Sequence, residues 1–265
     1  MNIIVPIKQV PETSNVKMDP ETGTMIRGGV ETVVNPLDLY AIETALRLKE
    51  EHSGRVTAIT MGPPPAEKAL REAVAMGCDE ALLVSDRKFG GADTWATSYT
   101  LAQAIKTLDE FDLIIAGERA TDGDTAQVGP GIAAWLHLPV ATYVAKIERI
   151  DSGTMTVERL VEEGYQILRL PMPSLITVVK EIAAPRLPTL RGKKRARTME
   201  IPVRNTENMT LDPAALGLKG SPTRVVKIDT PKVTRGGRVV TATDEASIES
   251  AVDELFAFLR AKELV

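Results

Sequence analysis

The chain has 265 residues, of which 43% are hydrophobic and 26% charged, enough for a sizeable core beneath an ordinary charged surface. A net charge of -4 disfavours a dedicated nucleic-acid-binding protein, because such proteins need a basic face. One cysteine, Cys78, and two histidines exclude an internal disulfide framework and disfavour a cysteine or histidine metal site.

The first half of the chain alternates short apolar runs with amphipathic segments. The runs predict strands over residues 2–7, 55–61, 81–84 and 113–116. The segments between them predict a helix capped by Asn35 or Asp38, one over 66–76, one from Asp93 or Thr94 to about Leu108, and one over 125–136. This alternation predicts a mostly parallel sheet covered on both faces, and right-handed crossovers make it a doubly wound α/β fold.

The pattern changes after about Pro139. Residues 142–150 and 154–161 flank the turn Asp151-Ser152-Gly153 and predict a hairpin, with further strands over 165–170 and 175–179. From Pro185 to about Arg238 the chain is basic and weakly periodic, so we expect it to lie on another surface rather than bury itself. A last amphipathic helix over 244–259 packs either on its own domain or on a partner. Its apolar stripe comprises Ile248, Val252, Leu255 and Leu259.

The loop after the fourth predicted strand is the most unusual stretch of the chain. It reads Gly117, Glu118, Arg119, Ala120, Thr121, Asp122, Gly123, Asp124, Thr125, Ala126, Gln127, Val128. Open parallel sheets bind ligands outside the carboxyl ends of their strands, and small residues beside a helix start suit a phosphate. Asp122 and Asp124 suit helix capping or ribose hydroxyls better than an anion. Because no lysine follows the glycines as in a P-loop, an ordinary capped loop carries about equal weight from the residues alone.

Further polar or small residues are expected at the same edge of the sheet. They are Pro6, Ile7 and Lys8 at the first strand end, Thr60, Met61 and Gly62 at the second, Asn35 and Asp38 at the first helix start, and Gly90, Gly91, Ala92, Asp93 and Thr94 before the third helix. Each alone is more often plain turn chemistry. Their coincidence at one edge favours a ligand site, with the glycine pair suited to a phosphate or a flavin edge.

Conventional catalytic constellations are missing from the sequence. His52 follows a polar helix end and His137 lies in a helix-to-strand turn, so no Ser-His-Asp arrangement can be argued. The residues therefore favour a binding or relay protein over a hydrolase. No run reaches the length of a membrane span, and the apolar residues 1–10, which include Lys8, are too short for a signal segment, so we expect a cytoplasmic protein.

A cluster of basic residues follows the last predicted strand. It comprises Arg191, Lys193, Lys194, Arg195 and Arg197. A solvated basic loop and a docking loop for an acidic protein surface are both open, since surface charges mainly raise association rates. Leu190 at its edge is the candidate apolar anchor. A nucleic-acid patch lacks the interleaved aromatic residues that stack on bases.

Several long motifs in order give the chain a family resemblance. They are VPIKQVPETSNVKMDPETG, NPLDLYAIETALRLKE, LREAVAMGCDEALLVSD, GERATDGDTAQVGP, PRLPTLRGKKRA and SPTRVVKIDTPKV. Together they resemble the beta subunit of electron-transfer flavoproteins over nearly the whole chain. The resemblance implies a flavodoxin-like α/β domain over residues 1–184 and a recognition loop and C-terminal arm over 185–265, packed on a larger alpha subunit that carries the redox FAD.

The resemblance also implies site residues. The positions matching the family's adenine-nucleotide elements are Pro6, Asn35, Ala58, Ile59, Thr60, Met61 and Gly117 to Val128. Residues 186–195 resemble the loop that docks acyl-CoA dehydrogenases or other partner dehydrogenases, with Leu190 matching its anchoring leucine. Acid–base catalysis is absent from the family.

Two cofactors are open for the nucleotide site. Mitochondrial members hold structural AMP, whereas bifurcating members hold a second FAD that takes hydride from NADH. The small residues of 122–130 and 90–94 resemble the bifurcating type, so FAD is expected, with AMP as the alternative. Thr94 and Thr97, one helical turn apart, are the hypothetical flavin-lining pair. An ATP-binding regulatory module of the universal-stress-protein kind is a third, less supported reading.

Overall fold

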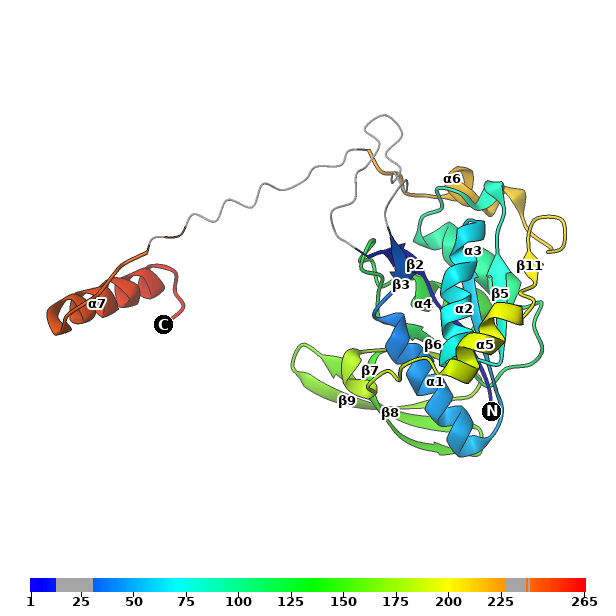
Figure 1. Ribbon diagram of the computed structural model, residues 1–265, viewed down its shortest axis with the longest axis horizontal. Helices are drawn as coiled ribbons and strands as arrows, with labels where there is room; N and C mark the ends of the chain where they lie inside the picture. Colours follow the sequence, from blue (N-terminus) through cyan, green and yellow to red (C-terminus); the bar gives the residue numbers. More distant parts are fainter. Residues whose placement is uncertain (13–30, 227–236, 238) are drawn as a thin grey trace. The chain divides into compact units, whose positions relative to one another are not determined.

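The computed structural model describes residues 1–12, 31–226, 237 and 239–265. The chain divides into two compact units, Met1–Lys227 and Ile228–Val265. The first unit holds the sheet and six of the helices described below, and the second holds the C-terminal helix (Figure 1). The expected boundary at 184/185 falls inside the first unit. The sequence predicts an irregular course for residues 185–238, and most of the end of that segment, residues 227–236 and 238, lies outside the described residues.

Among the described residues, nine strands form one sheet in the order β11-β5-β4-β1-β6-β10-β7-β8-β9. Their bounds are β1 Asn2–Pro6, β4 Arg55–Met61, β5 Glu80–Val84, β6 Leu113–Gly117, β7 Val140–Asp151, β8 Thr154–Val161, β9 Gly164–Pro171, β10 Ser174–Val178 and β11 Val203–Arg204. A separate antiparallel pair joins β2 (Gln9–Pro11) to β3 (Thr32–Val34). All neighbours from β11 to β7 are parallel, and β7-β8-β9 is antiparallel.

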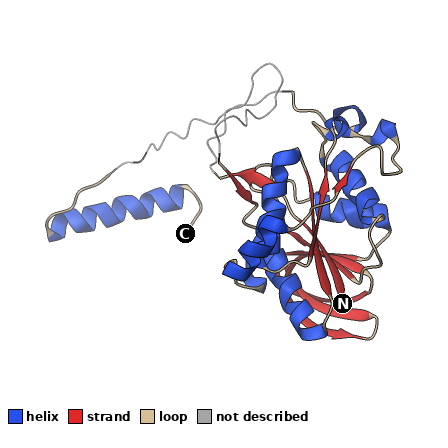
Figure 2. Cartoon of the chain, turned by 45° about the vertical axis from the view of Figure 1, so that its right-hand side comes forward, coloured by secondary structure: helices blue, strands red, loops and turns tan. Residues whose placement is uncertain are grey.

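Helices cover both faces of the sheet (Figure 2). The α-helices of the first unit are α1 Asp38–His52, α2 Glu67–Met76, α3 Thr94–Ile105, α4 Val128–Leu136, α5 Leu190–Thr198 and α6 Gly217–Gly220. Short 3-10 turns are η1 Pro64–Ala66, η2 Arg87–Phe89, η3 Lys180–Ile182 and η4 Pro213–Ala215. One apolar core joins α1, α2 and Ala196 of α5, and the other joins α3 and α4. The predicted doubly wound α/β fold is confirmed.

The predicted hairpin is confirmed, while two helix starts differ from expectation. Asp151 pairs with Thr154 across the turn. The fourth helix begins at Val128 and not at 125, because Asp124 and Ala126 have left-handed backbone, with φ of 35° and 56°. Leu37 stands at the cap of α1 without a side-chain cap bond, so neither Asn35 nor Asp38 caps that helix. The side chains of both are engaged elsewhere, as described below.

Residues 185–226 are more ordered than their weak periodicity predicts. The helix α5 packs on α2, and β11 adds a parallel strand beside β5. Ala196, Ala215 and Leu216 are buried in the two cores. Each element here is too short to show a helical or strand period, so isolated apolar residues that fill gaps in the core gave no pattern to recognise.

The C-terminal helix α7 spans Glu245–Ala261. Asp244 caps it, with its side chain accepting a hydrogen bond from the Ser247 N–H, and Ser247 completes a capping box. Its apolar residues Ile248, Val252 and Leu255 are exposed, and none of the seventeen residues described for this helix is buried. The amphipathic helix predicted over 244–259 is therefore confirmed as a helix.

Candidate functional site

The order in which the chain adds strands to the sheet reverses between β1 and β6, which are parallel neighbours. The chain passes from β1 to β4 and β5 on one side and then returns to β6 on the other side, where β10 and β7 follow β6 in the spatial order of the sheet. Pro6 and Gly117 end the two adjoining strands at this switch point. Doubly wound sheets bind their ligands in the crevice outside such a point. The predicted loop 117–128 therefore starts at the position that the topology favours for a ligand.

The loop has an unusual backbone. A side chain at Gly117 would collide with Asp38 Oδ1 and the Leu37 carbonyl, so only glycine fits where β6 ends. Asp124 and Ala126 both lie in the left-handed region, which non-glycine residues occupy at an energetic cost and often at functional sites. Among the described residues, the N–H groups of Thr125 through Gly129 donate to no protein acceptor.

Asn35 holds this loop through its side-chain amide. Its Nδ2 donates to Arg119 O at 2.9 Å and to Asp38 Oδ1 at 2.9 Å, and its Oδ1 accepts from the Thr121 N–H at 3.2 Å. Asn35 is completely buried. Both amide protons are thus used within the chain. Asn35 therefore positions the loop, and its contact with a cofactor stays a prediction.

Asp38 completes the hold on Asn35. Its Oδ1 accepts from Asn35, and its Oδ2 accepts from the Lys8 N–H at 2.7 Å. Burial raises the pKa of Asp38 to about 7, while the hydrogen bonds from Asn35 and Lys8 and the Lys8 charge act in the opposite direction. The site therefore contains a carboxyl group that titrates near neutral pH.

Charged side chains surround the outer part of the loop. Lys8 Nζ lies 2.6 Å from Asp122 Oδ1, and Arg119 Nη1 lies 2.8 Å from Asp124 Oδ1. Both predicted aspartates therefore bind cations of the chain itself rather than capping α4. The Lys8–Asp122 pair joins the segment just after β1 to the loop after β6, so Lys8 lies at the sheet edge where its place after the first strand predicts it.

The structure separates the predicted residues of β4. Ala58 and Ile59 are completely buried, and Thr60 Oγ1 donates to Ile7 O at 2.8 Å. Met61 and Gly62 are partly exposed at the carboxyl edge. Of this run, only the last two residues present side-chain or backbone surface at the crevice.

The predicted flavin edge before α3 contacts α6, although Gly90 and Gly91 both stay exposed. Leu218 of α6 donates its N–H to Gly90 O at 3.0 Å, and a side chain at Gly91 would lie 3.1 Å from Leu218 Cβ. This contact with α6 gives the glycine pair a packing reason. Thr94 and Thr97 lie partly buried in the first turn of α3, which Asp93 caps by accepting from the Ala96 N–H.

The predicted docking residues lie on α5 and just before it. Leu190 is 87% exposed, and Arg191, Lys193 and Lys194 are exposed as well. Arg195 is exposed too, but its Nη1 donates to Cys78 O at 2.9 Å and its Nη2 donates to Asp79 O. Within the described residues, Arg195 therefore fixes α5 on the end of α2.

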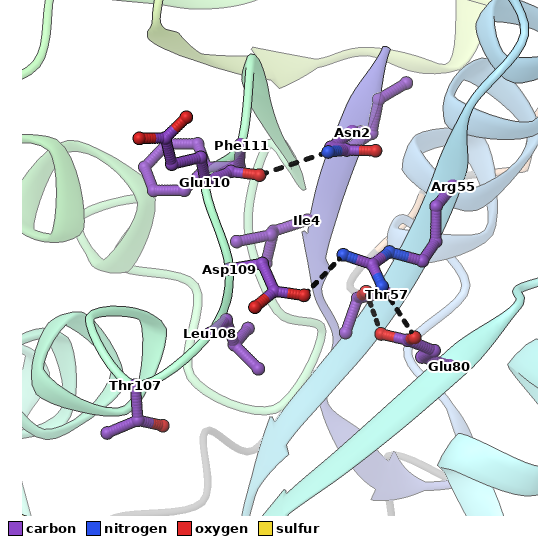
Figure 3. Close-up of a pocket in the computed structure, with 11 residues that line it drawn as sticks. Asn2, Ile4, Arg55, Thr57, Glu80, Thr107, Leu108, Asp109, Glu110 and Phe111 are labelled. Carbon is purple, nitrogen blue, oxygen red and sulfur yellow. Dashed lines mark hydrogen bonds and ion pairs between the residues drawn. The ribbon is translucent and has the colours of Figure 1, made fainter.

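A cavity of about 130 Å³ lies at the opposite, amino edge of the sheet (Figure 3). Arg55 reaches into it and pairs with Glu80 Oε1 and Asp109 Oδ2, both at 2.9 Å. Because its guanidinium is held by two carboxylates, Arg55 is not available for an anion. The cavity is separate from the switch-point crevice.

The described residues contain no group of three or more His, Cys, Asp or Glu side chains that could hold a metal ion. Nor does any described helix have the length and apolar character needed to cross a membrane. Cys78 is buried, and burial raises the pKa of its thiol to about 12, so it is not a nucleophile at neutral pH.

Fold and crevice together define a doubly wound α/β protein with its candidate site at the topological switch point. Residues 22–208 match the electron transfer flavoprotein domain. The electron transfer flavoprotein subunit beta of Thermoanaerobacterium thermosaccharolyticum is 46% identical over 96% of this chain and 98% of its own.

Two further relatives carry the names of enzyme complexes. The caffeyl-CoA reductase-Etf complex subunit CarD of Acetobacterium woodii is 46% identical over 100% of both chains. The acryloyl-CoA reductase electron transfer subunit gamma of Anaerotignum propionicum is 44% identical over 96% of this chain and 98% of its own. The chain belongs to the electron transfer flavoprotein family and is an electron-transfer subunit of the beta kind. The regulatory-module reading is thereby displaced.

Proposed function

We propose that this chain is the beta subunit of a heterodimeric electron-transfer flavoprotein, that it binds FAD in the crevice between β1 and β6, and that it takes part in NADH-dependent flavin-based bifurcation. One observation carries the proposal. At the start of α4, the successive backbone N–H groups from Thr125 to Gly129 donate to no acceptor among the described residues. Such donors at a helix start are suited to a pyrophosphate.

The chain's own residues have separate roles in this proposal. The backbone of 125–129 holds the phosphates, Met61 and Gly62 border the adenosine, and Thr94 and Thr97 border the ring. Asn35 and Asp38 keep the loop in place beside the cofactor. Bound FAD would supply hydride acceptance and one-electron transfer, which this chain's side chains do not provide.

AMP remains the alternative occupant, and one observation favours it. The contact of Leu218 with the Gly90-Gly91 turn explains those glycines without a flavin. With AMP the chain would be a structural and docking subunit of a simple electron carrier. The adenosine and phosphate contacts would be the same in both cases, so only the space beside Thr94 and Thr97 distinguishes them.

The partners proposed are an alpha subunit and a dehydrogenase. The exposed apolar stripe of α7 supports a C-terminal arm that packs on the alpha subunit, since such a stripe needs a partner surface. The names of the relatives from caffeyl-CoA and acryloyl-CoA reductase complexes support an acyl-CoA dehydrogenase as the second partner. A cytoplasmic location is part of the same proposal.

Cofactor stoichiometry tests the function. The chain is co-expressed with its alpha subunit, the heterodimer is denatured, and released FAD and AMP are quantified. Two FAD and no AMP per heterodimer, with NADH reducing flavin in the intact complex, is the expected result. One FAD with one AMP would replace the proposal by the simple carrier. The Thr125–Gly129 loop would fail as a site if neither nucleotide were released beyond the FAD of the alpha subunit.

A further inference from the structure

Arg186 forms a five-bond clamp on α1. Its Nε lies 2.7 Å from Glu43 Oε2 and its Nη2 lies 3.2 Å from Glu43 Oε1. Its Nη1 and Nη2 contact the two oxygens of Glu50 at 2.5 and 3.1 Å. The Arg186 backbone N–H also donates to Glu43 Oε2 at 3.1 Å. Forked contacts of this kind fix the direction of a guanidinium as well as its position.

The clamp stands on a buried carboxylate. Only 4% of the Glu43 side chain is exposed. Burial opposes its ionisation, but hydrogen bonds from Arg186 and Arg47 outweigh that effect and hold the pKa of Glu43 below its ordinary value. Arg47 Nε binds the same carboxylate at 2.8 Å. Glu43 therefore keeps one cationic partner when Arg186 is replaced, so the fold is expected to survive the replacement.

The clamp is placed directly before two strongly exposed leucines. Leu187 is 86% exposed and Leu190 is 87% exposed. Pro185 and Pro188 restrict the backbone on either side of Leu187. Thr189 caps α5 by accepting from the Gly192 N–H. The short segment 186–190 is thus held at its start by α1 and at its end by α5.

The second anchor of the segment is the α2–α5 contact. Arg71 of α2 donates to Ala196 O, and Gly192 lies so close to Ala75 O that a side chain there would collide with it. Figure 1 shows α5 beside α2. Exposed leucines between two rigid anchors are preorganised for binding, because less conformational entropy is lost when a partner covers them.

The charge around the leucines indicates the kind of partner. Arg191, Lys193, Lys194 and Arg197 are exposed and form no ion pair with any described residue. An apolar pocket with a carboxylate rim would match an apolar pair bordered by cations that have no acidic partner in the described part of the chain. Nothing in the clamp itself faces this partner, since Arg186 is turned onto α1.

From these contacts we propose that Arg186 is a positioning residue that holds Leu187 and Leu190 as a two-leucine anchor for an acidic-rimmed apolar pocket on the partner dehydrogenase. The inference rests on the proposed function for the existence of that partner. It adds Leu187 to the anchor. It also explains how both leucines are oriented, since Arg186 is held on α1 by Glu43 and Glu50.

The test uses the intact heterodimer with its alpha subunit. Electron transfer to the acryloyl-CoA reductase of Anaerotignum propionicum, freed of its own electron transfer subunits, is compared with reduction of a small soluble dye that needs no docking. R186M keeps the apolar stem, and E50Q weakens the clamp at its exposed end. E51Q is the matched control one residue away, and R186K tests whether a point charge restores the forked contact.

R186M is expected to raise the KM for the reductase about tenfold, with a smaller rise for E50Q, an intermediate one for R186K and none for E51Q. L187A and L190A are each expected to raise the KM as well. The double variant R186M/L190A should be little worse than L190A, because both changes remove the same interaction.

Each alternative outcome has a distinct meaning. If L190A raises the KM but R186M leaves it unchanged, the clamp is not a positioning device and the inference is overturned while docking stands. If neither L187A nor L190A alters the KM, the docking assignment fails and the inference fails with it. If R186M lowers cofactor content and dye reduction in parallel with reductase activity, its role is merely structural, which also overturns the inference.

Discussion

Replacing Asp38 by asparagine changes a buried group that titrates near neutral pH. Burial raises the pKa of Asp38 from 3.8 to about 7. Because the folded-state pKa lies above the unfolded value, the stabilising contribution is complete below pH 3.8 and is lost as the pH rises through about 7. At about 1.4 kcal/mol per pH unit, the loss reaches roughly 4 kcal/mol above the folded pKa.

The D38N variant escapes this loss, since an amide does not ionise. Its single oxygen, however, accepts from only one of the two donors that Asp38 serves, the Lys8 N–H and Asn35 Nδ2. An unsatisfied buried donor costs about 1–3 kcal/mol. The variant should therefore be about as stable as the wild type near pH 5 and more stable near pH 8, with the difference shifting by roughly 3 kcal/mol between them.

Thermal unfolding of the heterodimer at a series of pH values measures this shift. Each kcal/mol moves the Tm by about 2–4 °C in a chain of this size, so roughly 6–12 °C is expected across the series. D112N is the matched control, because Asp112 is exposed at the amino edge, where it accepts from the Asn2 N–H. Cofactor occupancy of D38N should fall at the same time, as Asn35 loses its fixed orientation. A stability difference between D38N and wild type that is identical at every pH would refute the buried-titration reasoning.

Three further variants test other contacts. N35A removes both bonds to the loop and should weaken cofactor retention about tenfold on dilution; unchanged retention would show that the loop holds itself. The double variant T94V/T97V should lower FAD occupancy while AMP still binds, and full FAD occupancy would remove the pair from the site. G192A places a side chain against Ala75 O, so α5 should shift and the Tm of the heterodimer should drop by the equivalent of about 1–3 kcal/mol.

Much of the sheet could be predicted because its signals are local. Apolar runs such as 113–116 and the Asp151-Ser152-Gly153 turn correspond to strands and a hairpin at nearly the predicted positions. The start of α4 could not be predicted in the same way. Residues 125–127 have ordinary helical composition, and their exclusion from the helix depends on left-handed backbone at Asp124 and Ala126, which local periodicity does not reveal.

For the candidate site too, one part could be predicted from the sequence and another part could not. Its location needed only the strand order, since the loop after a predicted strand at a switch point is the expected ligand position. The roles within it needed tertiary contacts. Asparagine is a common helix-capping residue, yet the side-chain amide of Asn35 donates to Arg119 O, 84 residues away along the chain. Arg186 gave a weak signal in the spacing of Glu43 and Glu50, two turns apart on one helix face, but only the fold brings it there.

The sequence alone determined the α/β class, the family and the loop where a ligand is expected, because hydrophobic period and long motifs are properties of contiguous residues. Tertiary structure decided which polar groups hold the loop, where residues 185–226 pack, and why two leucines stay exposed beside a clamped arginine. Those outcomes depend on hydrogen bonds and burial between residues far apart in sequence. The residues that form these hydrogen bonds become neighbours only once the sheet has formed.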